Sequence, residues 1–300
     1  MKLDPASLLD TVTVADGGWS TQLQMRGVPT NVPAETANLT HPEIVVALGR
    51  AYVEAGARFL TTNTFAANRL SMERRRVTAS IVDLNRVGAE LARQGAGDEP
   101  VVVVGAIGPS GKILAVREIT AERLHDVFAE QARALAAGGV DALVLETFSE
   151  LAEILTALKV VKEATGLPVI ASLSFDSGPQ RTCTLMGARA EDCAAALDDA
   201  GADVIGCNCG GGANTVLPAV VALRAATRKP LWVKPNAGLP DLEDGRAVYK
   251  QTPEEFTAIM PTLLDAGANI VGGCCGTGPE HIRRLAALVE GRKRTARRRV

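Results

Sequence analysis

Short apolar runs alternate with longer amphipathic stretches along most of the chain. Eight runs rich in Val, Ile and Leu each end in Gly, Pro or polar residues, a pattern typical of buried parallel strands. Between most of them, as in "TAERLHDVFAEQARALAAGG", apolar residues recur at helical spacing. We therefore predict strands within segments 12–18, 58–65, 101–109, 141–148, 168–175, 202–210, 230–238 and 268–276.

The junctions between helices and strands repeat a short motif. "AYVEAGARFL", "ALAAGGVDAL", "ALDDAGADVI" and "LLDAGANIV" each place Gly just before the next apolar run, where a left-handed residue ends a helix. Eight strand–helix units without a linker predict an α/β fold, a closed (β/α)8 TIM barrel. A doubly wound open sheet is the alternative if one strand is misassigned. Two longer segments, 66–78 and 239–253, are predicted to be loops at carboxyl ends of strands.

Composition narrows the class of protein. Hydrophobic residues make up 47% of the 300 residues and aromatic residues only 3%, so Ala, Val, Leu and Ile must build the core. A net charge of −2 gives no preference for nucleic acid or a membrane. We find no signal peptide or apolar run of spanning length and expect a cytoplasmic protein. We expect one domain over residues 1–291 and a basic, disordered tail over 292–300.

Polar and thiol residues stand at the ends of several predicted strands. In a barrel these strand ends meet at one mouth, which is where active sites of this fold are built. Lys234 lies near one such end, so a Schiff-base lyase is one reading of the chain. His41, His125 and His281 are expected to have surface roles. The strand-end candidates are Asp16, Asn63, Glu146, Ser174, Cys207, Cys209, Asn236, Cys274 and Cys275.

The cysteines are the most informative of these residues. Cys209 and the adjacent pair Cys274 and Cys275 would converge at the mouth, and three thiolates around an open fourth position form a zinc arrangement. Flanking glycines would permit the bend that turns two adjacent thiols toward one ion. The same sequence is also consistent with cysteines that act as small buried apolar residues, or with an anion-binding Gly loop. The spacing alone does not decide between these interpretations and a metal site. Cys183 and Cys193 are predicted to be structural.

Several stretches together resemble a known family. "DGGWSTQLQMRG", "TTNTF", "GAIGPSG", "LETF", "GCNC", "PNAGLP" and "GGCCGTGPEHI" occur in the order seen in homocysteine S-methyltransferases, which include the homocysteine-binding module of cobalamin-dependent methionine synthase. The similarity runs from about Val14 to His281. It implies a Zn²⁺ site formed by Cys209, Cys274 and Cys275, while Cys207 occupies a variable position of the motif.

The resemblance also implies a substrate site. Asp16 and Glu146 match residues that bind the amino group of homocysteine, and N–H groups near Ser20 and Thr21 would face its carboxylate. Asn236 matches a residue that fills the fourth zinc position when substrate is absent. The full set expected to bind substrate is Asp16, Ser20, Thr21, Asn63, Glu146 and Asn236.

The implied activity is transfer of a methyl group from an activated donor to the homocysteine thiolate, which gives methionine. Family members use S-methylmethionine, betaine or a methylated corrinoid protein as donor. Few aromatics are available to surround a quaternary ammonium group (Trp19, Phe65 and Phe148 are the candidates), so we favour a sulfonium donor. A zinc- or thiol-binding barrel module without its own turnover is the alternative from another class, and we also consider a homo-oligomer.

Overall fold

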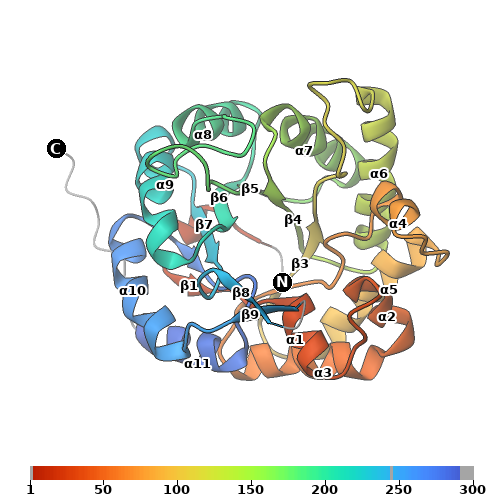
Figure 1. Ribbon diagram of the computed structural model, residues 1–300, viewed down its shortest axis with the longest axis horizontal. Helices are drawn as coiled ribbons and strands as arrows, with labels where there is room; N and C mark the ends of the chain where they lie inside the picture. The colour runs from red at the N-terminus through yellow and green to blue at the C-terminus, as the bar shows by residue number, and fades with distance from the viewer. Residues whose placement is uncertain (1–2, 244–245, 291–300) are drawn as a thin grey trace.

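The computed structural model describes residues 3–243 and 246–290 of the chain, and these form a barrel of eight parallel strands surrounded by helices (Figure 1). The strands are hydrogen-bonded in the order β1-β10-β7-β6-β5-β4-β3-β2. A bridge between Ala15 and Phe59 joins the two end strands and closes the barrel, which confirms the predicted fold. The strands are β1 (Thr13–Val14), β2 (Phe59–Thr61), β3 (Val102–Ile107), β4 (Ala142–Phe148), β5 (Val169–Leu173), β6 (Val204–Cys209), β7 (Leu231–Pro235) and β10 (Ile270–Val271).

Helices cover the outside of this barrel, and several of them begin at side-chain caps. Ser80, Thr120 and Thr252 each accept a hydrogen bond from a backbone N–H in the first turn of the helix that follows. The helices are α1 (Trp19–Met25), α2 (Ala37–Thr40), α3 (Pro42–Glu54), α4 (Arg69–Arg74), α5 (Ile81–Ala96), α6 (Ala121–Ala137), α7 (Leu151–Thr165), α8 (Ala190–Asp199), α9 (Ala213–Ala226), α10 (Pro253–Asp265) and α11 (Pro279–Val289), with 3-10 turns η1 (Ala6–Leu8) and η2 (Ala34–Thr36).

Alternation along each strand separates two apolar clusters. On β3, Val102 and Val104 point into the barrel, whereas Val103 and Ile107 pack against the helices. Trp232 and Phe59 fill the barrel interior in an edge-to-face contact, with ring centroids 5.9 Å apart. A side chain at the end of a strand therefore faces the mouth only if it lies in phase with the interior set.

The predicted helix-ending junctions are confirmed, whereas both predicted loops contain regular secondary structure. Gly56, Gly139, Gly201 and Gly267 all have positive φ angles, as the repeated helix-ending motif predicts. The prediction of a loop over 66–78 is wrong in part, because this segment contains α4. Segment 239–253 was predicted to be a loop, but it forms an antiparallel hairpin of β8 (Pro240–Glu243) and β9 (Arg246–Tyr249).

The structure bears on the prediction about membranes but not on the prediction about the C-terminal segment. No helix in residues 3–243 and 246–290 is long and apolar enough to cross a bilayer. The basic segment 292–300 lies outside the described residues, so the predicted tail stays a prediction.

Candidate metal and substrate site

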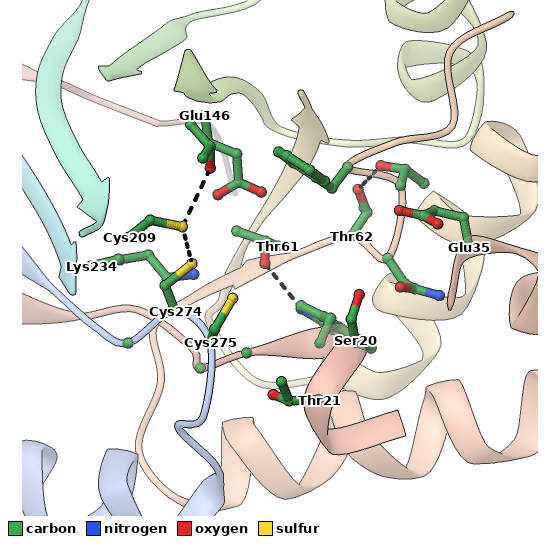
Figure 2. A pocket seen from close by; sticks show the side chains of 18 residues that line it. Ser20, Thr21, Glu35, Thr61, Thr62, Glu146, Cys209, Lys234, Cys274 and Cys275 are labelled. Carbon is green, nitrogen blue, oxygen red and sulfur yellow. Dashed lines mark hydrogen bonds between the residues drawn. The ribbon is translucent and has the colours of Figure 1, made fainter. Parts of the chain in front are cut away.

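Three thiols meet at the carboxyl ends of two barrel strands. Cys209 ends β6, and Cys274 and Cys275 follow β10. Their three sulfur atoms all lie within 4.8 Å of one another, and the Sγ atoms of Cys209 and Cys274 are 3.1 Å apart. Figure 2 shows the three side chains converging on one side of a cavity. The expected convergence of these residues is confirmed.

An unusual backbone angle directs Cys209 to this place. Strict alternation along β6 gives Cys209 the phase of Cys207, whose buried side chain packs in the outer apolar cluster. Cys209 instead has φ +62°, in the left-handed region that non-glycine residues rarely adopt. Backbone strain of this kind concentrates at functional sites.

Hydrogen bonds and close packing hold the turn that carries the paired cysteines in place. The N–H of Cys274 donates to the carbonyl of Pro235 at 2.8 Å, and that of Cys275 donates to Oδ1 of Asn236 at 3.0 Å. Asn236 also donates from Nδ2 to the carbonyl of Gly210, so one amide joins the two cysteine loops. Gly276 has φ +81°, and a Cβ there would lie 2.3 Å from the ring of Tyr249. Asn236 thus positions Cys275, and its predicted role as a metal ligand stays a prediction.

The three thiols shift one another's pKa values because they lie so close together. Hydrogen bonds from Cys209 and Cys274, and a contact with the Tyr249 hydroxyl, lower the pKa of Cys275. The hydrogen bond with Cys274 in turn raises the pKa of Cys209. The cluster therefore stabilises one thiolate at the expense of the others, and a cation would relieve their mutual repulsion. Three soft sulfur donors at this spacing fit a metal ion such as Zn²⁺, with Zn–S distances of about 2.3 Å.

A cavity of about 320 Å³ opens beside the thiols. Ser20, Thr21, Asn63 and Glu146 line it, as do the three cysteines, so most of the predicted site residues share one space. Ser20 and Thr21 belong to the first turn of α1, and Thr21 Oγ1 accepts a hydrogen bond from the N–H of Gly276. The cavity suits a small ligand or two rather than a macrocycle.

A bulge at the end of β4 brings Glu146 to the cavity wall. The register between β4 and β5 shifts after Leu145, and Thr147 has φ +63°. This irregularity lets both Glu146 and Thr147 line the cavity although they are adjacent in sequence. Burial raises the pKa of Glu146 to about 8, although the nearby positive charge of Lys234 opposes that shift. A positively charged ligand group would favour the ionised carboxylate.

Asp16 occupies a different position from the one expected. Its side chain is fully buried and is not among the residues that line the cavity. Its carboxylate lies 2.5 Å from Nζ of Lys234 and accepts hydrogen bonds from Trp19 Nε1 and from the N–H and Oγ1 of Thr61. The structure shows Asp16 as the partner of Lys234, and its contact with a substrate ammonium group stays a prediction.

The sequence of the chain matches a known protein family over most of its length. The sequence model described as homocysteine S-methyltransferase matches residues 13–289. The chain belongs to the homocysteine S-methyltransferase family.

The chain is similar to curated proteins and to a solved structure. It is 31% identical over 309 residues to methionine synthase of Mycobacterium tuberculosis (strain ATCC 25618 / H37Rv), covering 97% of this chain and 26% of that protein. It is 31% identical over 302 residues to methionine synthase of Mycobacterium leprae (strain TN), covering 94% and 25%. The chain thus spans about a quarter of the length of these curated relatives. The metallated form of the homocysteine methyltransferase MmuM from Escherichia coli has the same fold, with a TM-score of 0.79, 24% identity, and coverage of 95% and 100%.

Two further residues at the cavity of this homocysteine S-methyltransferase domain are not predicted by the sequence patterns. Glu35 is a buried carboxylate on the cavity wall, and Tyr249 touches Cys275 from the hairpin. Neither residue ends an apolar strand, so the pattern gave no signal for them. The expectation that His281 has a surface role is wrong: its ring is buried, accepts from the N–H of Gly278 and packs against Phe256. Burial lowers the pKa of His281.

Cys183 provides a test of which thiols form the site. It lies in the β5–α8 connection, outside the three-sulfur group, and Cys193 and Cys207 are buried in the outer apolar cluster. We expect Cys183→Ala to retain about one equivalent of metal per chain, measured by plasma emission after gel filtration under reducing conditions. Loss of the metal from this variant would show that the metal does not reside at Cys209, Cys274 and Cys275.

Proposed function

We propose that this chain transfers a methyl group from an activated donor to the thiol of homocysteine and so forms methionine. One observation carries the proposal. Three thiols from two strand ends that are far apart in sequence lie together at one small cavity, and the carboxyl group of Glu146 lines the same cavity. Family membership agrees with this chemistry. We further propose residues 1–291 as one functional unit.

We propose Zn²⁺ as the metal and Cys209, Cys274 and Cys275 as its ligands, because soft thiolates select this ion. A free thiol has a pKa of about 8.5, so homocysteine is mostly protonated at neutral pH. When bound, the ion supplies the positive charge that keeps a coordinating thiol ionised.

The chain's own residues orient the substrate in this proposal. The Glu146 carboxylate accepts hydrogen bonds from the ammonium group of homocysteine. The N–H groups near Ser20 and Thr21 face the carboxylate of homocysteine. These contacts fix the sulfur near the three cysteines and reduce the entropy lost when the donor arrives. The sulfur lone pair forms the new S–CH₃ bond, and the electron pair of the broken bond leaves with the donor.

Glu146 provides a direct test of substrate binding. Glu146→Gln removes the charge that faces the ammonium group, which costs about 1.5–3 kcal/mol. We expect homocysteine to bind about 10–150-fold more weakly to the zinc-loaded variant, measured by calorimetric titration. Glu153→Gln is a matched control because Glu153 is also buried but pairs with Ser110 and does not line the cavity. Equal homocysteine affinity in wild type and Glu146→Gln would remove Glu146 from the site.

The alternatives make different predictions. A Schiff-base lyase needs a neutral lysine, but Lys234 is paired with Asp16. Burial alone would lower the pKa of Lys234, yet the charges of Asp16 and Glu146 outweigh that effect and raise it. A binding module without turnover would retain zinc yet form no methionine from S-methylmethionine, betaine or a methylated corrinoid. Incubating the zinc-loaded chain with homocysteine and each donor, and assaying methionine, tests the proposed function.

A further inference from the structure

Asn208 lies on β6 next to the three thiols, one residue before Cys209. Its side chain is 1% exposed and points into the barrel, in phase with Val204 of the interior apolar cluster. Ser172 of β5 is buried beside it, so a polar pair separates the apolar interior from the mouth. A buried polar side chain in this place is costly unless each of its groups has a partner.

The orientation of the Asn208 amide follows from its neighbours. Oδ1 accepts a hydrogen bond from the backbone N–H of Thr147 at 2.9 Å and another from Ser172 Oγ at 2.7 Å. A backbone N–H can only donate, so this edge of the amide must be the carbonyl oxygen. The NH₂ group is therefore the edge that faces the thiols.

The two N–H bonds of this amide have separate partners. Nδ2 lies 2.6 Å from Thr147 Oγ1, 3.5 Å from Cys209 Sγ and 4.0 Å from Cys274 Sγ. One N–H thus donates to the threonine hydroxyl, and the second is directed at the pair of sulfur atoms. The Tyr249 hydroxyl contacts the remaining thiol, Cys275, so every sulfur of the cluster has a donor beside it.

Such a donor has a clear chemical use at the proposed metal centre. Three cysteinates around a divalent ion carry a net charge of about −1, and a homocysteine thiolate brings this to about −2. A hydrogen bond to a thiolate stabilises the charged form, and groups behind the ligands also fix the directions of the ligands. Because an amide is neutral, Asn208 supplies this stabilisation without placing a further charge beside the cavity.

The same contacts orient the amide before any ion binds. Thr147, which is bonded to Asn208 through both its N–H and its Oγ1, has the positive φ angle of the bulge in β4. That bulge brings Glu146 to the cavity wall. Asn208 therefore joins the strand end that carries Glu146 to the thiols that follow β6 and β10. A donor held in this way needs no reorganisation when charge develops near it.

We propose that Asn208 is a positioning residue of the metal centre. Its N–H donates to the thiolates of Cys209 and Cys274, stabilises their negative charge and fixes their directions toward the ion. This inference rests on the proposed function, because it takes the three thiols as the ligands of Zn²⁺.

The test compares wild type with Asn208→Ala and Asn208→Asp, each loaded with zinc or, in a separate preparation, with Co²⁺ as a spectroscopic probe. Both variants lose the N–H, and Asn208→Asp keeps the two hydrogen bonds that Oδ1 accepts, which protects the fold. We expect zinc to bind about 10–100-fold more weakly to each variant, measured by competition with a chromophoric chelator. The sulfur-to-cobalt charge-transfer band should move to longer wavelength, because a sulfur without an N–H donor holds its electrons less tightly.

Ser172→Ala is the matched control. It removes one hydrogen bond from the opposite edge of the same buried amide but leaves the N–H that faces the sulfur atoms. Its zinc affinity and its cobalt band should match those of wild type. Far-ultraviolet circular dichroism of all the variants checks that the barrel is folded.

The other outcomes separate this inference from the proposed function. Wild-type zinc affinity and an unshifted cobalt band in the Asn208 variants would overturn it. Equal changes in Ser172→Ala would show that the amide only supports the fold, which also contradicts the proposal. If the variants behave as expected but wild type forms no methionine with any donor, methyl transfer fails and the role of Asn208 stands. If wild type binds neither zinc nor Co²⁺, the metal site is wrong and the inference fails with it.

Discussion

Replacing Cys274 or Cys275 with alanine is expected to abolish metal retention and methyl transfer while the barrel stays folded. Each substitution removes one of three clustered sulfur donors, and two thiols do not make a stable zinc site. The loss of affinity should exceed the roughly 10–100-fold that loss of an outer-shell partner costs. Both residues are only partly buried in a turn beyond β10, so neither deletion opens a cavity in the core.

The measurement is zinc content after dialysis against a weak chelator, together with far-ultraviolet circular dichroism and methionine formation. Cys183→Ala, handled identically, controls for general loss of a thiol. X-ray absorption at the zinc edge of wild type should show three sulfur neighbours and a fourth when homocysteine is added. One equivalent of zinc retained by both the Cys274→Ala and the Cys275→Ala protein would overturn the ligand assignment.

The barrel is predictable from sequence because its signals are local and repeated. Each barrel strand lies in a short apolar run, and each of Gly56, Gly139, Gly201 and Gly267 follows a helix with a positive φ angle. The hairpin β8–β9 lacks such a signal: its first strand is fully exposed, so no apolar alternation marks it.

The candidate site is less predictable because it depends on exceptions to local rules. Strand alternation gives Cys209 the outward phase, and its left-handed backbone angle reverses this. The "GCNC" motif predicts the cysteine as a site residue, but it does not predict the φ angle of Cys209. Asp16 and Lys234 are 218 positions apart in sequence, and only the closed barrel brings them together. Glu35 lies in the short 3-10 turn η2, which shows no apolar periodicity, so its burial follows from tertiary packing alone.

The buried pair of Lys234 and Asp16 leads to the second large expected effect. Lys234→Met leaves the Asp16 carboxylate buried without a cation, and breaking a buried pair in this way costs about 3–5 kcal/mol. The hydrogen bonds from Trp19 and Thr61 remain and should hold the loss near the lower end of that range. We expect a reduced free energy of unfolding in urea, followed by circular dichroism.

The double variant Asp16→Asn, Lys234→Met separates this explanation from a chemical role for the lysine. Removing both charges eliminates the uncompensated carboxylate, so the double variant should regain most of the stability lost by Lys234→Met. A Schiff-base lysine would behave differently: its removal would leave the free energy of unfolding unchanged and abolish activity alone. Recovery of stability in the double variant would show that Asp16 and Lys234 act as a neutral pair at the cavity, which leaves Glu146 and Glu35 as the acidic side chains that line it.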